Sequence, residues 1–145
     1  MSTGERGVHT KQSGMTLIEL LVVITIIGVL ASIALPSYRT YVLRANRSDA
    51  KTKLLWAAGA LERCYTRNNS YKTDLPGCSV TLPVTSENGH YQITGVIPDG
   101  GQTFELTATP QNAQAKDKDC ANFVLDNFNT RKVSGTKTGP ECWSK

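Results

Sequence analysis

The chain has few side chains that could act as nucleophiles or metal ligands: two histidines and four cysteines among 145 residues. His9 lies within the first fourteen residues, and His90 stands apart from any serine and aspartate grouping. A catalytic or metal centre needs several such groups at fixed spacing. We therefore interpret His90 as a surface turn residue, and the sequence predicts no enzyme, cofactor or metal site.

The run from Lys116 to Asp119 alternates lysine with aspartate. Its two carboxylates could offer oxygen ligands to calcium, but the neighbouring lysines would compete for them. We favour a solvated loop. The formal net charge of the whole chain is +4, which is mildly basic and by itself no signature of a nucleic-acid-binding protein.

One carboxylate, Glu19, lies at the edge of a long apolar segment. The uncharged run from Leu20 to Tyr38 contains 19 residues, which as a helix at ~1.5 Å per residue matches a bilayer core of ~30 Å. It is longer than the apolar region of a secretory signal peptide, although a simple signal anchor is an alternative. Pro36, near its end, predicts a kink or helix end.

The residues from Ser13 to about Tyr41 resemble the class III signal of type IV prepilins, with Gly14 followed by Met15-Thr16-Leu17-Ile18-Glu19. The resemblance implies that a prepilin peptidase cuts between Gly14 and Met15 and methylates the new N-terminus at Met15. It also implies that Glu19, five places into the mature chain, is the assembly charge. Met15 stands where most members of the family have Phe, and its bulky apolar side chain should support both reactions.

The resemblance implies three segments: a cleaved leader (1–14), a transmembrane and assembly half-helix (15–42), and a periplasmic globular domain (43–145). The positively charged flanks conflict with this topology. The leader carries Arg6 and Lys11, whereas Arg39, Arg44 and Arg47 follow the apolar run, so a count of positive charges would place the C-terminal part inside. Four cysteines argue for an oxidising compartment instead. We expect an inner-membrane protein with a cytoplasmic N-terminus before assembly, and an extracellular fibre afterwards.

Beyond Pro36 the pattern becomes one-sided. Apolar residues recur at spacings of three, four and seven, which predicts an amphipathic helix: Leu43, Ala50, Leu54, Ala57, Leu61, Cys64 and Tyr65. One helix should therefore run from about Met15 to Asn68 and end at Asn68-Asn69-Ser70. Leu55 and Trp56 lie off this stripe and could either cover the following loop or contact a neighbouring subunit.

Three basic residues lie on or near one flank of the same helix. Arg44 and Lys51 fall together, and Arg47 lies nearer the apolar stripe. They could contact DNA phosphates. Because aromatic residues are not interleaved with them, we favour a solvated or subunit-facing flank.

The C-terminal half predicts an antiparallel sheet. Residues 90–97 and 103–109 flank the turn signal Pro98-Asp99-Gly100-Gly101, and residues 122–126 and 130–134 flank a second turn that contains Asn129. Residues 80–84 are a candidate for one further short strand. The expected fold is α+β, a type IV pilin fold with one long N-terminal helix packed on a four-stranded antiparallel meander. Residues 91–143 resemble minor pilins of the PilE type, except that Asn129 replaces an expected glycine.

Four cysteines permit three pairings, and sequence alone does not choose among them. We predict the disulfides Cys64–Cys78 and Cys120–Cys142. Cys64 ends the expected helix and Cys78 lies in the loop that follows, whereas Cys142 would tie down a tail that has few apolar residues.

The favoured function is a structural subunit, a minor pilin, of a retractile type IV pilus for adhesion, twitching motility or DNA uptake. The alternatives are a DNA-uptake pilin that binds DNA directly and a type II secretion pseudopilin. The mature chain would carry 14 Lys+Arg and 11 Asp+Glu once Arg6, Lys11 and Glu5 are removed, a net charge of +3 that does not decide between these functions.

Expected partners are other pilin subunits, prepilin peptidase, the inner-membrane pilus assembly machinery and membrane lipid, with DNA as a candidate. Glu19 should neutralise the Met15 amine of a neighbouring or its own subunit.

Overall fold

A computed structural model describes residues 14–144. The chain forms two compact units, one ending at Tyr38 and the other beginning at Arg39. Helix α1 (Leu17–Asn68) contributes to both units. It begins two residues later than expected, and it ends at Asn68 as predicted, where Asn69 adopts a positive φ of 52°.

The first unit contains the apolar half of α1. This half is long and apolar enough to cross a membrane, and its side chains are not buried within the chain. Pro36 lies inside α1, so the helix does not end there; a kink at Pro36 stays a prediction. Proline removes one backbone donor from the helix, but the remaining hydrogen bonds can carry the helix through it.

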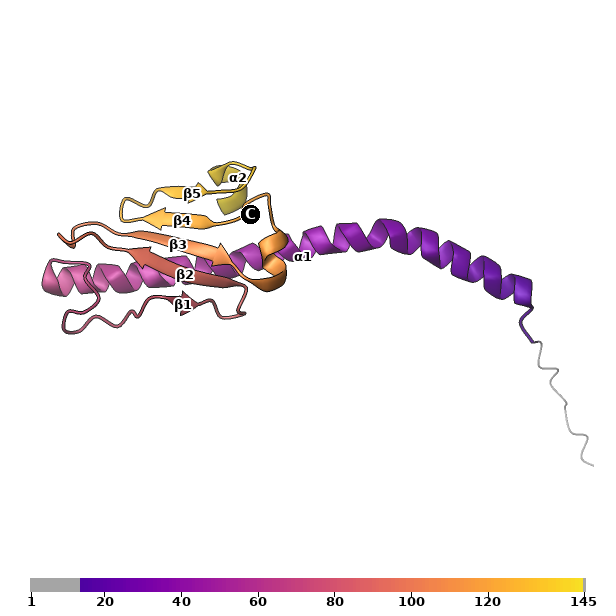
Figure 1. Ribbon diagram of the computed structural model, residues 1–145, viewed down its shortest axis with the longest axis horizontal. Coiled ribbons are helices and arrows are strands. Elements are labelled where there is room, and N and C mark those ends of the chain that lie inside the picture. The colour runs from indigo at the N-terminus through magenta and orange to yellow at the C-terminus, as the bar shows by residue number, and fades with distance from the viewer. Residues whose placement is uncertain (1–13, 145) are drawn as a thin grey trace, which may run out of the picture. The chain divides into compact units, whose positions relative to one another are not determined.

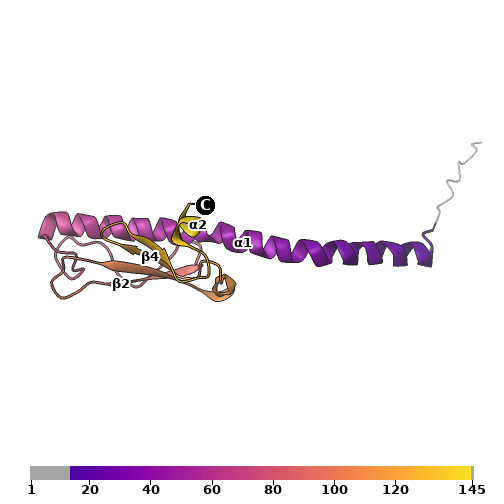
Figure 2. The same ribbon diagram turned by 90° about the horizontal axis from the view of Figure 1, so that it is seen from above.

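The second unit has two layers, with the second half of α1 lying along one face of a sheet (Figures 1 and 2). The sheet has five antiparallel strands in the order β1-β2-β3-β4-β5: β1 (Val84–Thr85), β2 (Tyr91–Val96), β3 (Glu105–Pro110), β4 (Phe123–Asp126) and β5 (Arg131–Val133). The expected meander on one helix is confirmed, but the count of four strands is wrong. The fifth strand is β1, which has two residues and exists through its pairing with β2 at Val84↔Ile93.

The core of the second unit lies between α1 and the sheet. Period-3.6 positions of α1 are fully buried, as the stripe predicts: Ala50, Leu54, Ala57, Leu61 and Cys64. Alternate residues of the strands meet them, as a half-buried sheet requires: Tyr91, Ile93, Leu106, Ala108, Phe123 and Leu125.

The two predicted turns have the backbone geometry that the sequence indicated. The Gly101 amide donates to the Pro98 carbonyl at 2.8 Å, and Gly101 has φ 64°. Asn129 has φ 60° and therefore supplies the left-handed conformation expected of a glycine. Two short helices were not predicted: the 3₁₀ helix η1 (Asn112–Lys116) and α2 (Gly139–Trp143).

Candidate functional site

The predicted N-terminal site consists of Gly14, Met15 and Glu19. Glu19 and Thr16 form a reciprocal cap: the Thr16 amide and hydroxyl both donate to Glu19 Oε2 at 3.2 Å, and the Glu19 amide donates to Thr16 Oγ1 at 3.2 Å. This arrangement satisfies amides that the first turn of a helix leaves unpaired. Met15 is exposed, and no other described residue approaches within 4 Å of the position that a side chain at Gly14 would occupy.

Because the bond between Gly14 and Met15 is intact in this chain, the Met15 nitrogen is a peptide amide and carries no charge. Cleavage would convert it into an ammonium one residue before the Thr16–Glu19 cap begins. The local geometry thus holds one carboxylate oxygen near the point where the new positive charge would appear.

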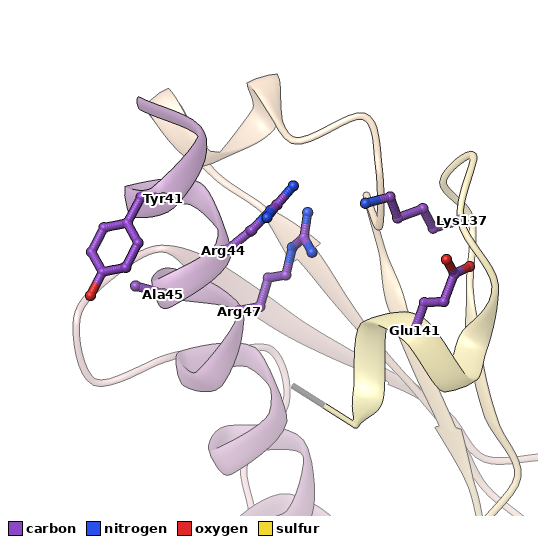
Figure 3. Close-up of a pocket in the computed structure, with 6 residues that line it drawn as sticks. All are labelled: Tyr41, Arg44, Ala45, Arg47, Lys137 and Glu141. Atoms are coloured by element: carbon purple, nitrogen blue, oxygen red, sulfur yellow. The ribbon is translucent and has the colours of Figure 1, made fainter. Parts of the chain in front are cut away.

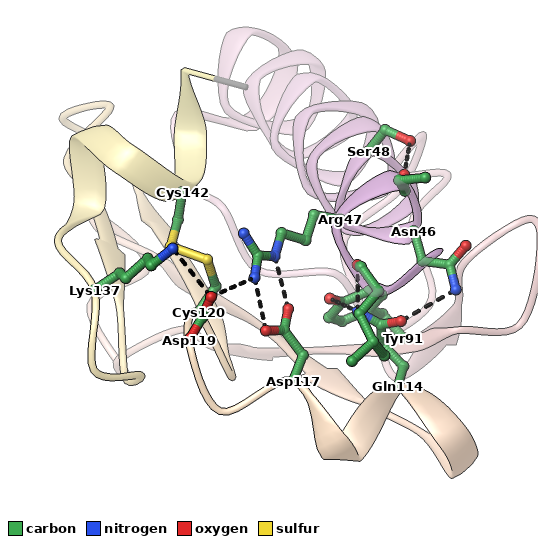
Figure 4. A network of polar contacts seen from close by, with 12 residues as sticks. Asn46, Arg47, Ser48, Tyr91, Gln114, Asp117, Asp119, Cys120, Lys137 and Cys142 are labelled. Atoms are coloured by element: carbon green, nitrogen blue, oxygen red, sulfur yellow. Dashed lines mark hydrogen bonds and ion pairs between the residues drawn. A yellow bond between two sulfur atoms is a disulfide. The ribbon is translucent and has the colours of Figure 1, made fainter. Parts of the chain in front are cut away.

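A second group of polar residues lies where α1 enters the second unit (Figure 4). Arg47 forms a two-pronged ion pair with Asp117, from Nε to Oδ2 and from a terminal nitrogen to Oδ1, each at 2.7 Å. Its terminal nitrogen also lies 3.5 Å from Asp119 Oδ2, which Lys137 approaches at 3.1 Å. The pair is buried, since Asp117 is 3 % exposed and Arg47 is 6 % exposed.

The electrostatics of this group follow from its pairing. The hydrogen bond with Asp117 raises the pKa of Arg47, outweighing the opposing effect of burial. The hydrogen bond from Lys137 lowers the pKa of the Asp119 carboxyl. Both shifts favour the charged forms, as close opposite charges do.

Gln114 and Asp49 extend the polar contacts on either side. Gln114 accepts from Asn46 Nδ2 at 3.1 Å and donates to the Leu43 carbonyl at 3.0 Å and to Tyr91 Oη at 2.9 Å. Burial raises the pKa of Tyr91 to about 12.

Asp49 fixes the turn between β1 and β2. Its carboxylate accepts from Ser86 Oγ at 2.6 Å and from the amides of Asn88 at 3.3 Å and His90 at 3.4 Å. His90 thus lies at a turn, as expected, and contributes its backbone to the contact. Within residues 14–144, every buried side-chain nitrogen or oxygen has a hydrogen-bond partner.

These contacts correct two expectations. The loop from Lys116 to Asp119 is not simply solvated, because Asp117 is buried against Arg47, 70 residues earlier in the chain. The basic flank of α1 is also not uniform. Arg47 is buried, and Lys51 is half-buried and donates to the Cys142 carbonyl at 3.5 Å. Burial, the larger cause, and the nearby Arg47 charge lower the pKa of Lys51.

The buried polar residues Arg47, Asp49 and Gln114 were not predicted as a site. One signal could have found Arg47: it occupies the stripe position between Leu43 and Ala50, at spacings of four and three. A charged residue at a buried helical position requires a partner. The identity of that partner was not visible, because it depends on tertiary structure.

The cysteines pair as Cys64 with Cys78 and Cys120 with Cys142, the same pairs as in the sequence analysis. The second bridge directly follows Asp119 and so borders the Arg47 contacts (Figure 4). Glu19 and Pro36 belong to the first unit, and the four cysteines belong to the second.

Leu55 and Trp56 remain about half exposed on α1. The Lys53 ammonium lies 4.3 Å from the centre of the Trp56 ring and 2.9 Å from Glu87 Oε1. Among the described residues, no group of three or more His, Cys, Asp or Glu side chains is placed to hold a metal ion.

Comparison with known families identifies two matching regions. Residues 9–35 match the prokaryotic N-terminal methylation motif. Residues 36–124 match the family described as type IV minor pilin ComP, DNA uptake sequence receptor.

Individual relatives are named as pilins or fimbrial proteins. The fimbrial protein EcpC of Eikenella corrodens is 38% identical over 98 residues, 68% of this chain and 62% of that protein. The type IV major pilin protein PilE1 of Neisseria gonorrhoeae is 32% identical over 110 residues, 76% of this chain and 51% of that protein. The chain thus spans less than two thirds of the length of these two relatives. The type IV major fimbrial protein FimA of Dichelobacter nodosus is 31% identical over 141 residues, 92% of this chain and 87% of that protein.

A solved structure agrees with these sequence matches. The structure of a type IV pilin from Shewanella oneidensis is similar with a TM-score of 0.50 and 29% identity, covering 71% of this chain and 99% of that one. Together with the long helix on an antiparallel sheet and the N-terminal motif around Gly14 and Glu19, these matches show that the chain belongs to the type IV pilin family.

Proposed function

We propose that this chain is a minor pilin, a subunit that enters a type IV pilus with other pilin subunits. The observation that carries the proposal is the first half of α1. Its apolar side chains are not covered by any other described part of the chain. Such a surface needs an apolar environment from outside the chain. A lipid bilayer before assembly and the apolar helices of neighbouring subunits afterwards would both supply it.

The precursor would be processed by prepilin peptidase between Gly14 and Met15, with methylation of the Met15 nitrogen. The match of residues 9–35 to the methylation motif supports this step. Mass spectrometry of pilin sheared from cells should find an N-terminus at Met15 that carries one methyl group. Gly14→Val should leave the full-length precursor in the membrane, because a branched side chain at the cut would obstruct a narrow peptidase site. A mature N-terminus at any other residue would contradict the assignment.

The proposed topology places the leader in the cytoplasm and the second unit in the periplasm. The two disulfides support this side, because they need an oxidising compartment. The inner-membrane assembly machinery would then extract the helix from lipid into the fibre. Labelling intact cells and spheroplasts with an impermeant reagent at a single added cysteine in the exposed loop 99–100 would report the side directly.

We assign Glu19 the role of pairing with the Met15 ammonium after cleavage. Its carboxylate already lies at the first turn of α1, held by Thr16. A buried charge requires a partner, and leaving one unpaired costs several kcal/mol. Pairing would therefore favour the axial register in which both charges are satisfied.

Glu19→Gln tests this role, because it keeps the size and much of the capping ability of the side chain but removes the charge. Cleavage and membrane insertion should persist, whereas the amount of subunit in sheared pili should fall by more than about tenfold, since each ~1.4 kcal/mol is a factor of ten. Glu87→Gln, an exposed acid of the second unit, is the matched control. If Glu19→Gln enters pili as well as the control does, Glu19 acts as a helix cap alone.

A second candidate function is direct DNA binding, and the family match over residues 36–124 favours it. Within the matched range we select three basic residues from the end of α1 and the loop that follows it, and call them the Arg63 surface: Arg63, Arg67 and Lys72. Arg63 and Arg67 are one helical turn apart and exposed, and none of the three forms an ion pair with a described residue. Basic side chains that lack an acidic partner within the protein are available to DNA phosphates.

Fluorescence anisotropy with a labelled DNA duplex at several salt concentrations tests this candidate. Replacing Arg63, Arg67 and Lys72 with alanine should weaken binding and reduce the slope of log K against log salt by about 0.9 for each phosphate that the variant no longer neutralises. The matched control replaces three basic residues elsewhere that are all exposed, Arg44, Lys116 and Lys118. An equal loss of affinity in both triple variants would show that binding follows net charge rather than this surface.

A type II secretion pseudopilin remains the alternative within the same fold. A deletion strain separates the three roles: loss of piliation indicates a fibre subunit, loss of transformation alone indicates DNA uptake, and loss of secretion indicates a pseudopilin.

A further inference from the structure

Several basic side chains at the beginning of the second unit and in the loop beside it have no acidic partner among the described residues. Arg39 directly follows the apolar run, and Arg44 comes six residues after Tyr38. None of the ion pairs among residues 14–144 includes Arg39, Arg44, Lys116 or Lys118. Of these, we call Arg44, Lys116 and Lys118, which line two hollows that share Arg47, the Arg44 surface.

The buried Asp117 explains why two of these charges face outward. Asp117 is drawn against α1 by its two hydrogen bonds to Arg47. Its neighbours Lys116 and Lys118 are both exposed, while Asp117 between them is buried. Within this alternating run, Asp117 therefore contacts α1, whereas the Lys116 and Lys118 side chains are exposed to solvent. Lys116 and Lys118 line a hollow of about 180 Å³ together with Thr40 and Leu43 of α1.

A larger hollow of about 480 Å³ shares Arg47 with the first (Figure 3). Tyr41, Arg44 and Ala45 of α1 line it on one side, and Lys137 and Glu141 on the other. The acids near this hollow are already engaged. Asp119 lies against Lys137 and Arg47, and Glu141 accepts from the Thr138 amide at 3.0 Å. Arg44 therefore remains the charge available to an anion that enters the hollow.

Arg39 and Arg44 follow the apolar run, so the proposed topology places them on the periplasmic side of the membrane. The positive-inside rule disfavours arginines on that side. A function for them in the periplasm would explain why they are there. Tyr38 and Tyr41 are 66 % and 70 % exposed, and tyrosines at the end of an apolar run are typical of the bilayer interface. Sequence continuity keeps residues 39–47 within about two to three helical turns of that interface while the first unit is in lipid.

We propose that the Arg44 surface binds anionic phospholipid headgroups and docks the second unit on the membrane before the subunit enters a fibre. The ligand is the headgroup phosphate, with Arg44 directed to the larger hollow and Lys116 and Lys118 at the rim of the smaller one. The proposal rests on the membrane stage of the function proposed above. Each basic side chain near an anionic leaflet strengthens binding about fivefold, so a surface of this size is enough to favour a docked unit over a free one.

The test uses the full chain reconstituted in nanodiscs of phosphatidylcholine alone or of phosphatidylcholine with one quarter phosphatidylglycerol. A trace of lipid with a gadolinium chelate on its headgroup relaxes nearby amide NMR signals. We expect enhanced relaxation of residues 114–119 and 137–142 in the anionic nanodiscs only, and little change at residues 72–78. Salt at about 0.5 M should remove the enhancement, because it screens exposed charges within a few ångströms.

Two triple variants of equal charge change decide the assignment. Alanine at Arg44, Lys116 and Lys118 should reduce relaxation in anionic nanodiscs to the level seen in phosphatidylcholine, whereas alanine at Arg63, Arg67 and Lys72 should leave it unchanged. The Arg47 ion pair is intact in both, so both should keep the wild-type amide spectrum elsewhere.

Three results would overturn the proposal: equal relaxation in the two lipid compositions, an equal loss of relaxation in both triple variants, or a loss of duplex DNA binding in the Arg44 variant with lipid docking unchanged. The last result would make the Arg44 surface a nucleic-acid surface. Failure of the subunit to enter pili would not alter the nanodisc measurement, so the docking proposal and the fibre proposal can fail separately.

Discussion

The two ends of α1 within the second unit are attached to the sheet and loops by different chemistry. At the end that contains Arg47, the contacts are polar and directional: Arg47 with Asp117, Asn46 with Gln114, and Asp49 with Ser86. At the end that contains Cys64, they are mostly aromatic. Tyr65 stacks on Tyr71 at 4.5 Å between ring centres, and Tyr71 meets the edge of Phe104 at 4.9 Å.

The difference separates two structural tasks. Apolar contacts are strong but tolerate small rotations and shifts, whereas two-pronged ion pairs and hydrogen bonds require one orientation. We interpret the Arg47 end as the part that fixes the rotation of α1 against the sheet, and the Cys64 end as the part that supplies burial. A disulfide reinforces each end.

The largest effect should come from breaking the polar end. Asp117→Ala leaves Arg47 buried without its main partner, which costs about 3 to 5 kcal/mol of unfolding free energy. Urea unfolding of the full chain in detergent measures it. Replacing both residues by apolar ones, as Arg47→Met with Asp117→Leu, should recover much of the loss. A cost below about 1 kcal/mol for Asp117→Ala would show that the pair does not hold this end.

The disulfides should contribute next. Replacing Cys64 and Cys78 by serine opens a loop with a sequence separation of 14, and replacing Cys120 and Cys142 opens one of 22. Loop-closure entropy gives about 3 kcal/mol for either bridge. Unfolding of the two double variants should therefore shift to lower urea by similar amounts. A much larger loss for the Cys120–Cys142 variant would indicate that this bridge also positions the Arg47 contacts.

Alkaline pH should affect both ends, because burial raises the pKa of Tyr71 and of Tyr91 to about 12. The unfolded tyrosine titrates near 10. The folded state therefore keeps its proton more tightly, and the stabilisation is complete below pH 10 and is lost as pH rises from 10 to 12. The loss for Tyr91, which is fully buried, is about 2 kcal/mol at pH 12.

Urea unfolding at pH 9 and pH 11 compares the wild-type chain with Tyr91→Phe and Tyr71→Phe. Each phenylalanine variant should show a shallower fall in stability with pH, since it has no phenol proton to lose. Parallel pH profiles for the wild type and Tyr91→Phe would mean that this hydroxyl ionises in the folded state as easily as in water.

The smallest effect should come from the exposed ion pair between Lys53 and Glu87, in which the Glu87 side chain is 77 % exposed. Glu87→Ala should change the unfolding free energy by less than about 1 kcal/mol, since water and salt screen such pairs. It is thus the natural control for Asp117→Ala, because both remove one carboxylate from an ion pair with α1. Equal losses in the two variants would remove the distinction between buried and surface pairs.

The sequence predicted the parts of this fold that repeat at short range. Residues Ala50, Leu54, Ala57 and Leu61 could be assigned to the core because helical spacing alone puts them on one face. The same spacing includes Arg47, yet its partner Asp117 is 70 residues away. No local sequence pattern indicates a contact between residues so far apart. The charged neighbours Lys116 and Lys118 also favoured the wrong prediction that the whole loop is solvated.

Short elements were predicted only in part, for a related reason: the candidate strand at residues 80–84 overlaps β1 at Val84 alone, and the two short helices were missed. The two residues of β1 have no period of their own and are defined by pairing with Ile93 and Gln92 of β2. Helix α2 has recognisable start signals, a Thr138–Glu141 capping box and Pro140, but only five residues, too few to show helical periodicity. At the N-terminus, by contrast, Gly14, Met15 and Glu19 could be proposed as a site from sequence, because the processing enzyme proposed for them would read contiguous sequence rather than tertiary structure.

The placement of the Arg47 contacts has a mechanical consequence. If the chain is assembled into a fibre, as proposed above, tension on that fibre would reach the second unit along α1 from its N-terminal side. Near that side, Asn46 and Arg47, followed by Asp49, fasten the helix through hydrogen bonds to residues far along the chain. Load along the helix axis would shear these bonds together, and the adjacent Cys120–Cys142 bridge would pass the force on to the covalent chain beyond them.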